Sequence, residues 1–423
     1  MNVLLVGGGG REHALAWKLR QSEHLTRLVA APGNPGIARH AECVAVSVDD
    51  HDALVRLADK ERVDLVVIGP EVPLVAGLAD RLAAAGAAVF GPRARAAAIE
   101  GSKVFAKTLM ARHGIPTARF DAFADPGRAR RFARDLGAPL VVKTDGLAAG
   151  KGAIVCATLA ESESAIAACL ERREFGGAGG TIVLEEFLVG DEVSFFALVN
   201  GRSATPLAAA QDHKAVFDGD RGPNTGGMGA FSPVAVFDAA MQERVMATIV
   251  RPTIAALADE GAAYSGVLFV QLMLTADGPK VVEFNCRFGD PECQAILAAM
   301  DADLLPMLVA VAGGHLPSAV SAAHRAAVCV TLASAGYPGT YATGVPITGI
   351  DAAEAIPGVE VFHAGTARRD GRLVTAGGRV LGVTAVADDV PRAIETAYEA
   401  VERIRFEGMH FRTDIGRRRA VAA

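Results

Sequence analysis

Residues 3–14, with the sequence VLLVGGGGREHA, join a short apolar run to four glycines and the start of an amphipathic stretch. A strand that passes through glycines into a helix is typical of the first β-α unit of a parallel sheet. Apolar runs and helical patterns then alternate through the first hundred residues, at 12–22, 28–31, 52–60, 65–68, 74–85 and 88–90. We therefore expect a parallel α/β domain here, with ligand-binding turns at the carboxyl edge of its sheet.

The glycine loop is a candidate anion site, because backbone N–H groups at a helix start attract anions and glycines let a phosphate approach closely. It lacks the third glycine of the dinucleotide fingerprint, since Glu12 lies three residues after Gly9 and His13 three residues after Gly10. The apolar run at 28–31 also lacks a final acid that would hold a ribose diol. The loop favours a phosphate or a phosphorylated sugar over NAD, and a tight turn without a ligand is the alternative.

The composition excludes several classes of protein. The chain has 423 residues, a net charge of −6 and 51% hydrophobic residues, which suits about two to four packed domains and argues against nucleic-acid binding. Its six cysteines form no Cys-x-x-Cys pair, so neither a zinc site nor a disulfide framework is expected. The amino end has no basic region typical of a signal peptide, and the uncharged stretch 326–350 has too many glycines and prolines for a membrane helix. We expect a cytoplasmic protein with no nucleic-acid or membrane partner.

A second glycine-rich loop, KTDGLAAGKG at 143–152, lies between two strand-like runs and carries a lysine near each end. It is not a P-loop, because only three residues separate Gly146 from Gly150, and Gly152 stands where Ser or Thr would hold Mg²⁺. A flexible hairpin of this kind can close over a triphosphate and exclude water, and a plain β-hairpin is the alternative.

The distribution of lysine supports a triphosphate site. The chain has only eight lysines, and five of them lie in the windows 101–107, 143–152 and 211–229. A compact ammonium on a flexible stem suits a phosphate that moves during transfer better than the planar fork of arginine does.

Residues 283–292, EFNCRFGDPE, contain a candidate metal pair. Glu283 and Asn285 are two residues apart on a predicted strand, so their side chains point to one face. A carboxylate and an amide oxygen suit Mg²⁺ whose coordination is completed by phosphates, and Arg287 on the same face could clamp an anion. The alternative is a strand whose polar residues simply face solvent.

Two other segments contain candidate binding groups. Residues 185–188 and Glu192 lie on a predicted strand pair, where acids could accept hydrogen bonds from a nucleotide and the backbone could bind an adenine edge. The strings QDHK at 211–214 and GPNTGGMG at 222–229 frame a long glycine-dense loop, and loops of this length are usually functional.

Taken together, these strings resemble the phosphoribosylamine–glycine ligases, an ATP-grasp family of purine biosynthesis. The matching strings run in family order and cover nearly the whole chain: 7–14 (GGGGREHA), 31–36 (APGNPG), 69–71 (GPE), 100–103 (EGSK), 145–152 (DGLAAGKG), 212–214 (DHK), 222–230 (GPNTGGMGA) and 283–292. The nonamer at 222–230 is the most specific of them.

The resemblance implies an α/β and α+β multidomain fold. Its parts would be an N-terminal parallel α/β domain at 1–102, an ATP-grasp domain of two subdomains at 103–324, and a small C-terminal α+β domain at 325–423. A mobile nucleotide-clamping subdomain would lie at about 118–190. The implied activity is ligation of glycine to 5-phospho-D-ribosylamine with ATP and Mg²⁺ or Mn²⁺. It would pass through glycyl phosphate and give glycinamide ribonucleotide, ADP and phosphate. A monomer or weak homo-oligomer is expected.

The resemblance also implies roles for individual residues. The expected ATP-binding residues are Lys103, Lys143, Gly146, Gly150, Lys151, Gly152, Glu185, Glu186, Phe187, Leu188 and Glu192. The expected substrate-binding residues are Gly9, Gly10, Arg11, Asn34, Pro70, Glu71, Asp212, Lys214, Asn224, Thr225, Gly226 and Arg287. The expected catalytic residues are Lys143, Lys151, Asp212, Lys214, Arg287 and Asp290, and the metal ligands are Glu283 and Asn285.

Two of the departures from the family pattern affect candidate site contacts. Ala215 follows Asp-His-Lys where the family commonly has Arg, so we expect one substrate or phosphate contact to be lost or moved. Gln271 stands where many ATP-grasp relatives have an acid, which leaves a second Mg²⁺ without an extra carboxylate.

Two other hypotheses compete with this interpretation. The first is a bicarbonate-using ATP-grasp carboxylase, which the strings at 7–14 and 222–230 oppose. The second is a silent nucleotide-binding module, which would not need the retained lysines together with Glu283 and Asn285.

Overall fold

The amino-terminal part of the chain forms a parallel sheet, as the alternation of strands and helices predicts. The computed structural model of the protein describes residues 1–147, 152–317 and 325–417. Its first sheet has the order β3-β2-β1-β4-β5, and every pairing in it is parallel. The strands are β1 (Asn2–Gly7), β2 (Arg27–Pro32), β3 (Glu42–Cys43), β4 (Leu65–Ile68) and β5 (Val89–Phe90).

The helices of this part are α1 (Gly10–Leu19), the 3₁₀ turn Ile37–Arg39, α2 (His51–Lys60), α3 (Glu71–Val75), α4 (Leu78–Ala84) and α5 (Ala94–Gly101). The pattern at 74–85 predicts one helix, but the structure has two. Gly77 separates them with a left-handed φ of 88°, a conformation that ends a helix and is favourable only for glycine.

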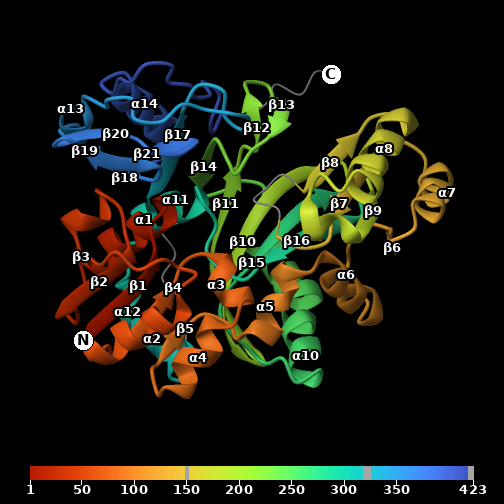
Figure 1. The fold of residues 1–423 in the computed structure, drawn as a ribbon, viewed down its shortest axis with the longest axis horizontal. Helices are drawn as coiled ribbons and strands as arrows, with labels where there is room; N and C mark the ends of the chain where they lie inside the picture. The colour runs from red at the N-terminus through yellow and green to blue at the C-terminus, as the bar shows by residue number, and fades with distance from the viewer. Residues whose placement is uncertain (148–151, 318–324, 418–423) are drawn as a thin grey trace.

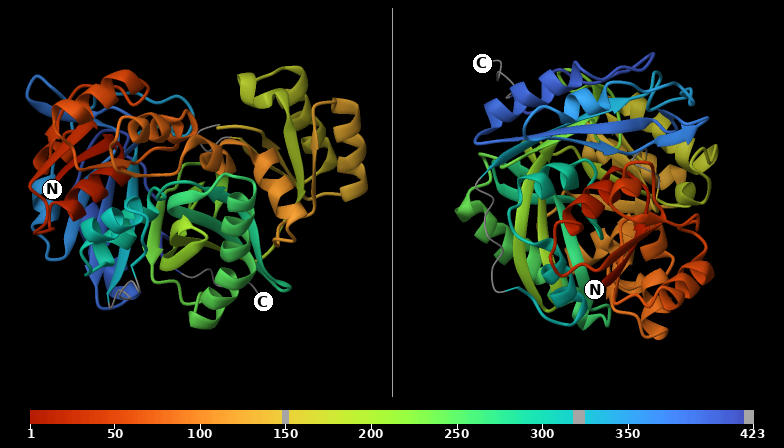
Figure 2. Two further views of the ribbon diagram at one scale, coloured as in Figure 1. Left: turned by 90° about the horizontal axis from the view of Figure 1, so that it is seen from below. Right: turned by 90° about the vertical axis from the view of Figure 1, so that its left-hand side faces the viewer.

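A second, smaller unit projects from the body of the molecule, as Figure 2 shows. Helix α6 (Lys103–Arg112) leads into a four-stranded antiparallel sheet of order β6-β9-β7-β8, with α7 and α8 packed on it. We call residues 120–186 the clamp. Its elements are β6 (Phe120–Phe123), α7 (Pro126–Leu136), β7 (Leu140–Thr144), β8 (Ala153–Cys156), α8 (Leu159–Ile166), the π turn Ala167–Glu171, the 3₁₀ turn Gly176–Gly180 and β9 (Ile182–Glu186).

The largest sheet has eight strands in the order β16-β15-β10-β11-β14-β17-β21-β18, all antiparallel. Because β14 pairs with β17, the sheet continues across residue 325 into the carboxyl-terminal part of the chain. Its strands are β10 (Asp191–Gly201), β11 (Ser203–Asp212), β14 (Gly229–Ser232), β15 (Tyr264–Thr275), β16 (Gly278–Asn285), β17 (Ala326–Ala333), β18 (Val359–His363) and β21 (Arg379–Ala387).

Helices and two small hairpins complete the structure (Figure 1). They are the hairpin β12 (Ala215–Phe217) and β13 (Arg221–Asn224), α9 (Ala239–Val245), the π turn Met246–Val250, α10 (Arg251–Asp259), α11 (Glu292–Ala299), α12 (Leu304–Ala312), α13 (Ile350–Glu354), the hairpin β19 (Thr366–Arg369) and β20 (Arg372–Thr375), and α14 (Val390–Val401). The predicted mixture of a parallel α/β domain, an ATP-grasp core and a carboxyl-terminal α+β part is confirmed.

The core lies on both faces of the large sheet. In β10 the side chains of Phe195 and Ala197 pack with α10, whereas Phe196 and Leu198 pack with α11 and α12 on the opposite face. Alternate residues of β1 join the same two clusters, so the parallel sheet shares its core with the central one through helices such as α12, which contacts β5, and α5, which contacts β16. This packing holds the amino-terminal turns next to the central strands.

No single helix in the described ranges is long and apolar enough to cross a membrane. Helices α11 and α12 meet the length and composition test only as a pair, and they are bent by 115° at the break between them.

Replacing Leu268 by Ala tests the central position of β15. The side chain is 0% exposed, and we expect its truncation to lower the free energy of unfolding by about 2–5 kcal/mol through lost burial and a residual cavity. Urea denaturation followed by circular dichroism measures this. Val189→Ala is the control, since Val189 is 73% exposed and should change stability by less than about 0.5 kcal/mol. Equal effects of the two substitutions would contradict the packing described.

Candidate active-site cleft

A cleft of about 1770 Å³ lies where the clamp, the central sheet and both terminal parts of the chain meet. It collects most of the residues that the sequence singles out. Those lining it are Arg11, Glu71, Lys103, Lys143, Gly146, Gly152, Glu185, Glu186, Phe187, Leu188, Glu192, Asp212, Lys214, Asn224, Thr225, Gly226, Glu283, Asn285, Arg287 and Asp290. Gly9, Gly10, Asn34 and Pro70 are not among the lining residues, and Gly150 and Lys151 lie outside the described residues.

Two lysines hold the carboxylate of Glu185 at the base of the clamp. Nζ of Lys107 lies 2.9 Å from Oε2, and Nζ of Lys143 lies 3.1 Å from Oε1. Burial lowers the pKa of Lys107 to about 8, although Glu185 acts in the opposite direction. Lys107 was not predicted as a site residue, and the only feature of the sequence that pointed to Lys107 is its place in the lysine-rich window 101–107. Glu185 therefore fixes the ammonium of Lys143 at the edge of the cleft.

The predicted metal pair lies on β16, and both side chains line the cleft. Burial acts to raise the pKa of Glu283, but the nearby charges of Lys214, Lys103 and Lys143 outweigh it and the pKa is lowered. The carboxylate stays ionised, as a metal ligand must. Among the described residues no cation lies within 4 Å of it, and Nδ2 of Asn285 is buried without a hydrogen-bond partner.

These two residues fit a magnesium ion that shares its coordination with a ligand. In the described ranges no group of three or more His, Cys, Asp or Glu side chains could hold a metal by itself. Mg²⁺ commonly takes one or two protein oxygens and completes its octahedron with phosphates and water. Glu283 and Asn285 supply two such oxygens, and the lysines beside them suit the phosphates.

Glu192 links the strand pair β10–β15 to the glycine-dense loop. Its Oε1 accepts hydrogen bonds from Nε2 of Gln271 and Nζ of Lys214, both at 2.7 Å. Burial acts to lower the pKa of Lys214, but the carboxylates of Glu192, Asp212 and Glu283 raise it overall. Gln271, which departs from the family pattern, therefore positions Glu192, and Lys214 remains charged.

Asp212, at the end of β11, has the properties of a proton acceptor. Burial and the nearby charges of Glu292 and Glu192 raise its pKa well above the ordinary value, although Lys214 opposes this. Its Oδ1 is buried and has no hydrogen-bond partner in the described part of the chain. A carboxyl group with a raised pKa and a free oxygen in a cleft is more basic than an ordinary carboxylate, which suits a group that exchanges a proton with a substrate.

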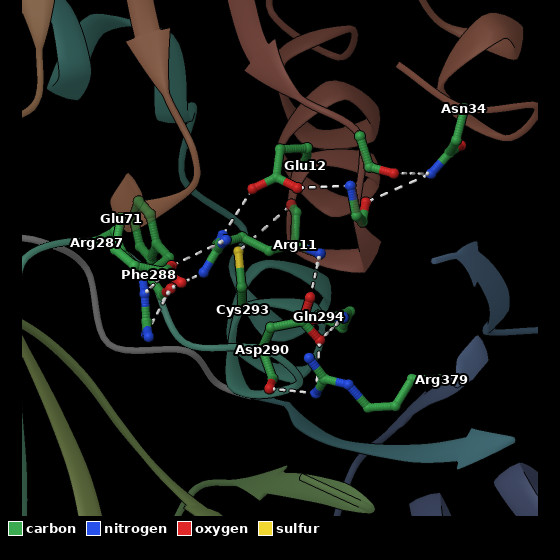
Figure 3. A network of polar contacts seen from close by, with 12 residues as sticks. Arg11, Glu12, Asn34, Glu71, Arg287, Phe288, Asp290, Cys293, Gln294 and Arg379 are labelled. Carbon is green, nitrogen blue, oxygen red and sulfur yellow. Dashed lines mark hydrogen bonds and ion pairs between the residues drawn. The ribbon is translucent and has the colours of Figure 1, made fainter. Parts of the chain in front are cut away.

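Arg11 and Arg287 form a cationic pair of side chains on the amino-terminal side of the cleft (Figure 3). Arg11 bonds Glu12 through Nε at 2.7 Å and the carbonyl of Phe288 through Nη1 at 3.0 Å. Arg287 binds Glu71 through Nε at 3.2 Å and Glu100 through Nη2 at 2.9 Å. Arg11 is therefore fixed by its helical neighbour and by a carbonyl near Arg287, and Arg287 is fixed by acids from other elements.

Carboxylates already occupy part of the predicted anion site at the start of α1. The N–H of Gly9 donates to Oε2 of Glu12 at 2.7 Å, and the N–H of Arg11 donates to Oδ2 of Asp290 at 3.0 Å. Asn34 uses its amide to hold the carbonyls of Gly8, at 2.9 Å, and His363, at 2.8 Å. The loop thus orders the junction between the terminal parts of the chain, and substrate binding by Gly9, Gly10 and Asn34 stays a prediction.

Two cleft residues come from the carboxyl-terminal part and were missed by the sequence analysis as site residues. Arg379, at the start of β21, donates through Nη1 to the carbonyls of Gly226 at 2.7 Å and Asp290 at 2.6 Å. Tyr337 accepts the N–H of Gly226 through its hydroxyl at 3.0 Å. No local motif marks either side chain, because their partners lie more than 85 positions away in the chain.

Family models match almost the whole chain. They are the N domain of phosphoribosylglycinamide synthetase at residues 1–100, its ATP-grasp (A) domain at 101–293 and its C domain at 327–418. A phosphoribosylamine–glycine ligase from Agrobacterium fabrum is 53% identical over 418 residues, which cover 98% of each chain.

Solved structures agree with this match. A phosphoribosylamine–glycine ligase from Thermotoga maritima superposes with a TM-score of 0.85 at 33% identity, covering 98% of this chain and 100% of that one. A biotin carboxylase from Campylobacter jejuni shares the fold, with a TM-score of 0.75 at 15% identity over 97% of this chain and 92% of that one.

The ion pairs of Glu71 predict a pH-dependent contribution to stability. Burial acts to raise the pKa of Glu71, but Arg287 and Arg11 outweigh it and lower the pKa from 4.5 to about 2. The stabilisation is therefore complete above pH 4.5 and is lost as the pH falls towards 2. Glu71→Gln should lower the free energy of unfolding by up to about 3 kcal/mol at neutral pH. Urea denaturation should show this difference shrinking below pH 4.5.

Glu23→Gln on the exposed surface is the control, because Glu23 has no such ion pairs among the described residues. The network would be contradicted if the difference in unfolding free energy between wild type and Glu71→Gln stayed constant down to about pH 3, which is roughly one unit above the pKa of Glu71 in the folded protein.

Proposed function

Since the chain belongs to the phosphoribosylglycinamide synthetase family, it is an ATP-dependent ligase of purine biosynthesis, and we propose how its cleft performs the ligation. The reaction joins glycine to 5-phospho-D-ribosylamine and converts ATP to ADP and phosphate. The observation that carries the proposal is the placement of Glu283 and Asn285 in one cleft with Lys103, Lys143 and Lys214.

We assign the triphosphate to the lysines and the metal pair. Lys103 and Lys143 neutralise the phosphates, and Glu283 and Asn285 would hold Mg²⁺ or Mn²⁺, whose charge would polarise the transferring phosphoryl group. The segment 185–188 with Glu192 forms the adenosine seat. The loop 146–152, with Gly150 and Lys151, is proposed to close over the phosphates and exclude water.

The first step is attack of the glycine carboxylate on the γ-phosphorus, which gives glycyl phosphate and releases ADP. The amine of phosphoribosylamine then attacks the glycyl carbonyl, and phosphate leaves with one former carboxylate oxygen. Lys214 stabilises the negative charge that develops on the phosphoryl oxygens. Asp212 accepts the proton that the attacking amine loses.

We place the acceptor on the side of the cleft formed by Arg11, Glu71, Arg287 and Asp290. Asn224, Thr225 and Gly226 complete this side, with Gly9, Gly10, Asn34 and Pro70 as its outer neighbours. The fixed guanidinium groups orient an anionic acceptor without having to be ordered on binding.

The remaining parts of the proposal concern the whole molecule. We propose a cytoplasmic monomer or weak homo-oligomer, with domains at 1–102, 103–324 and 325–423. Light scattering of the purified protein over a concentration series tests the oligomeric state.

Transfer of labelled oxygen tests the reaction and its intermediate together. With glycine carrying ¹⁸O in both carboxylate oxygens, freshly made phosphoribosylamine and ATP, one ¹⁸O atom should appear in each phosphate released. Mass spectrometry of the phosphate measures this. A bicarbonate requirement would contradict the activity, and turnover without transfer of ¹⁸O would exclude glycyl phosphate.

Glu283→Gln should reduce kcat by about 10²-fold or more, because it removes the only negative charge among the two proposed metal ligands and weakens phosphoryl-transfer stabilisation. Initial rates at saturating Mg²⁺ and an unchanged circular dichroism spectrum define the effect. Glu243→Gln, with a side chain 65% exposed, is the matched control and should keep the wild-type rate. A normal kcat for Glu283→Gln would refute the metal assignment.

A further inference from the structure

The segment 213–228 leaves the central sheet after β11 and returns to it at β14, and the hairpin β12–β13 forms its outer part. Its base carries the cleft residues Lys214, Asn224 and Thr225. The N–H and Oγ1 of Thr225 both donate to the carbonyl of Lys214 at 2.8 Å, so the two sides of the base are joined to each other. Whatever fixes the hairpin therefore also fixes Lys214.

The carboxyl-terminal residues 410–414 run alongside this hairpin and bind its backbone repeatedly. Nε2 of His410 lies 2.8 Å from the carbonyl of Val216, and the N–H of Thr413 donates to Asp218 at 2.8 Å. The carboxylate of Asp414 accepts the N–H of Gly219 at 2.9 Å. These contacts join positions that are 194 and 195 residues apart in the chain.

Arg412 is the central residue of this contact. Its side chain is 1% exposed, and Nη1 donates to the carbonyl of Ala215 at 3.1 Å and to Asp220 at 2.8 Å. Nε and Nη2 both donate to Asp414 at 2.7 Å. A buried guanidinium is tolerated only when its donors are paired, and its planar fork sets the direction of each bond. Arg412 thus holds the backbone of the residue that directly follows Lys214.

The same part of the chain also holds the other end of the segment. The N–H of Gly226 donates to Tyr337, and its carbonyl accepts from Arg379. A Cβ atom at position 226 would lie 3.0 Å from Cζ of Arg379, so a larger residue there would push the guanidinium away from its present place. Both backbone polar groups of Gly226 are therefore bound by side chains that come from beyond residue 325.

We infer that Arg412 is a positioning residue for the proposed ligation: it holds Ala215 so that Lys214 lies beside Glu192 and the metal pair. The catalytic role of Lys214 in this inference rests on the proposed function. The structural half, that Arg412 fixes the segment 213–228, does not. The competing explanation is that Arg412 only stabilises the carboxyl-terminal part of the chain.

Steady-state kinetics separate the two explanations. Arg412→Ala should lower kcat by about 10- to 100-fold, since displacements of about 1 Å in a reacting constellation have effects of this size. The KM for ATP should stay within about threefold, because Glu192 keeps its hydrogen bond from Gln271, and among the described residues no hydrogen bond joins Arg412 to the rest of the adenosine seat at 185–188. The kcat of Arg412→Lys should lie between those of wild type and Arg412→Ala, because one ammonium can pair with Asp414 or Asp220 but cannot also reach the carbonyl of Ala215. Arg392→Ala, 68% exposed on α14, is the matched control and should behave as wild type.

Hydrogen–deuterium exchange tests the structural half without any assay of activity. In Arg412→Ala, amides of 213–228 should exchange faster, whereas β17 and β21 should keep their protection. A uniform loss of protection would show that Arg412→Ala is misfolded, and the decision then rests on Arg412→Lys. Normal exchange in 213–228 with a normal kcat, in whichever variant is folded, overturns the inference. If wild type had no ligase activity but Arg412→Ala still exchanged faster than wild type in 213–228, the proposed function alone would be refuted.

Discussion

The carboxylate of Asp290 is bound by groups from both terminal parts of the chain and from helix α11. Oδ2 accepts the N–H of Arg11 at the start of α1, and Oδ1 accepts from Gln294 in α11 and lies 3.2 Å from Arg379 in β21. Burial alone would raise its pKa, but Arg379 and Arg11 lower it, so the charge is retained inside the protein. Removing one charged partner from a buried carboxylate of this kind lowers the free energy of unfolding by about 3–5 kcal/mol. The mutual placement of the amino-terminal turn, the central sheet and β21 depends on it.

Three cations of the cleft are each held by acids from a different element. Lys143 is held by Glu185, Lys214 by Glu192, and Arg287 by Glu71 and Glu100. Each pair fixes a flexible side chain before substrates arrive, which reduces the entropy lost on binding.

Local sequence patterns predicted the features that depend on neighbouring residues. The alternation of strands and helices gave the parallel sheet, and the spacing of Glu283 and Asn285 gave their common face. Gly77 interrupts a helix that periodicity alone extends from 74 to 85, because apolar spacing does not report a left-handed φ. The hold on Glu185 by Lys107 and the roles of Arg379 and Arg412 could not be predicted. Each depends on partners that lie 78 to 197 positions away, and no local pattern encodes them.

The pairing of β14 with β17 has a consequence for the order in which the protein is made. β11 and β14 share only two paired positions, whereas β14 and β17 share four. A chain leaving the ribosome can complete the parallel sheet and the clamp early, since both close on segments that are near in sequence. The segment between β11 and β14 has no settled place until β17, β21 and the residues around 412 have emerged. On this order of synthesis, the parallel sheet and the subdomain 120–186 fold before the cleft between them and the carboxyl-terminal part is complete.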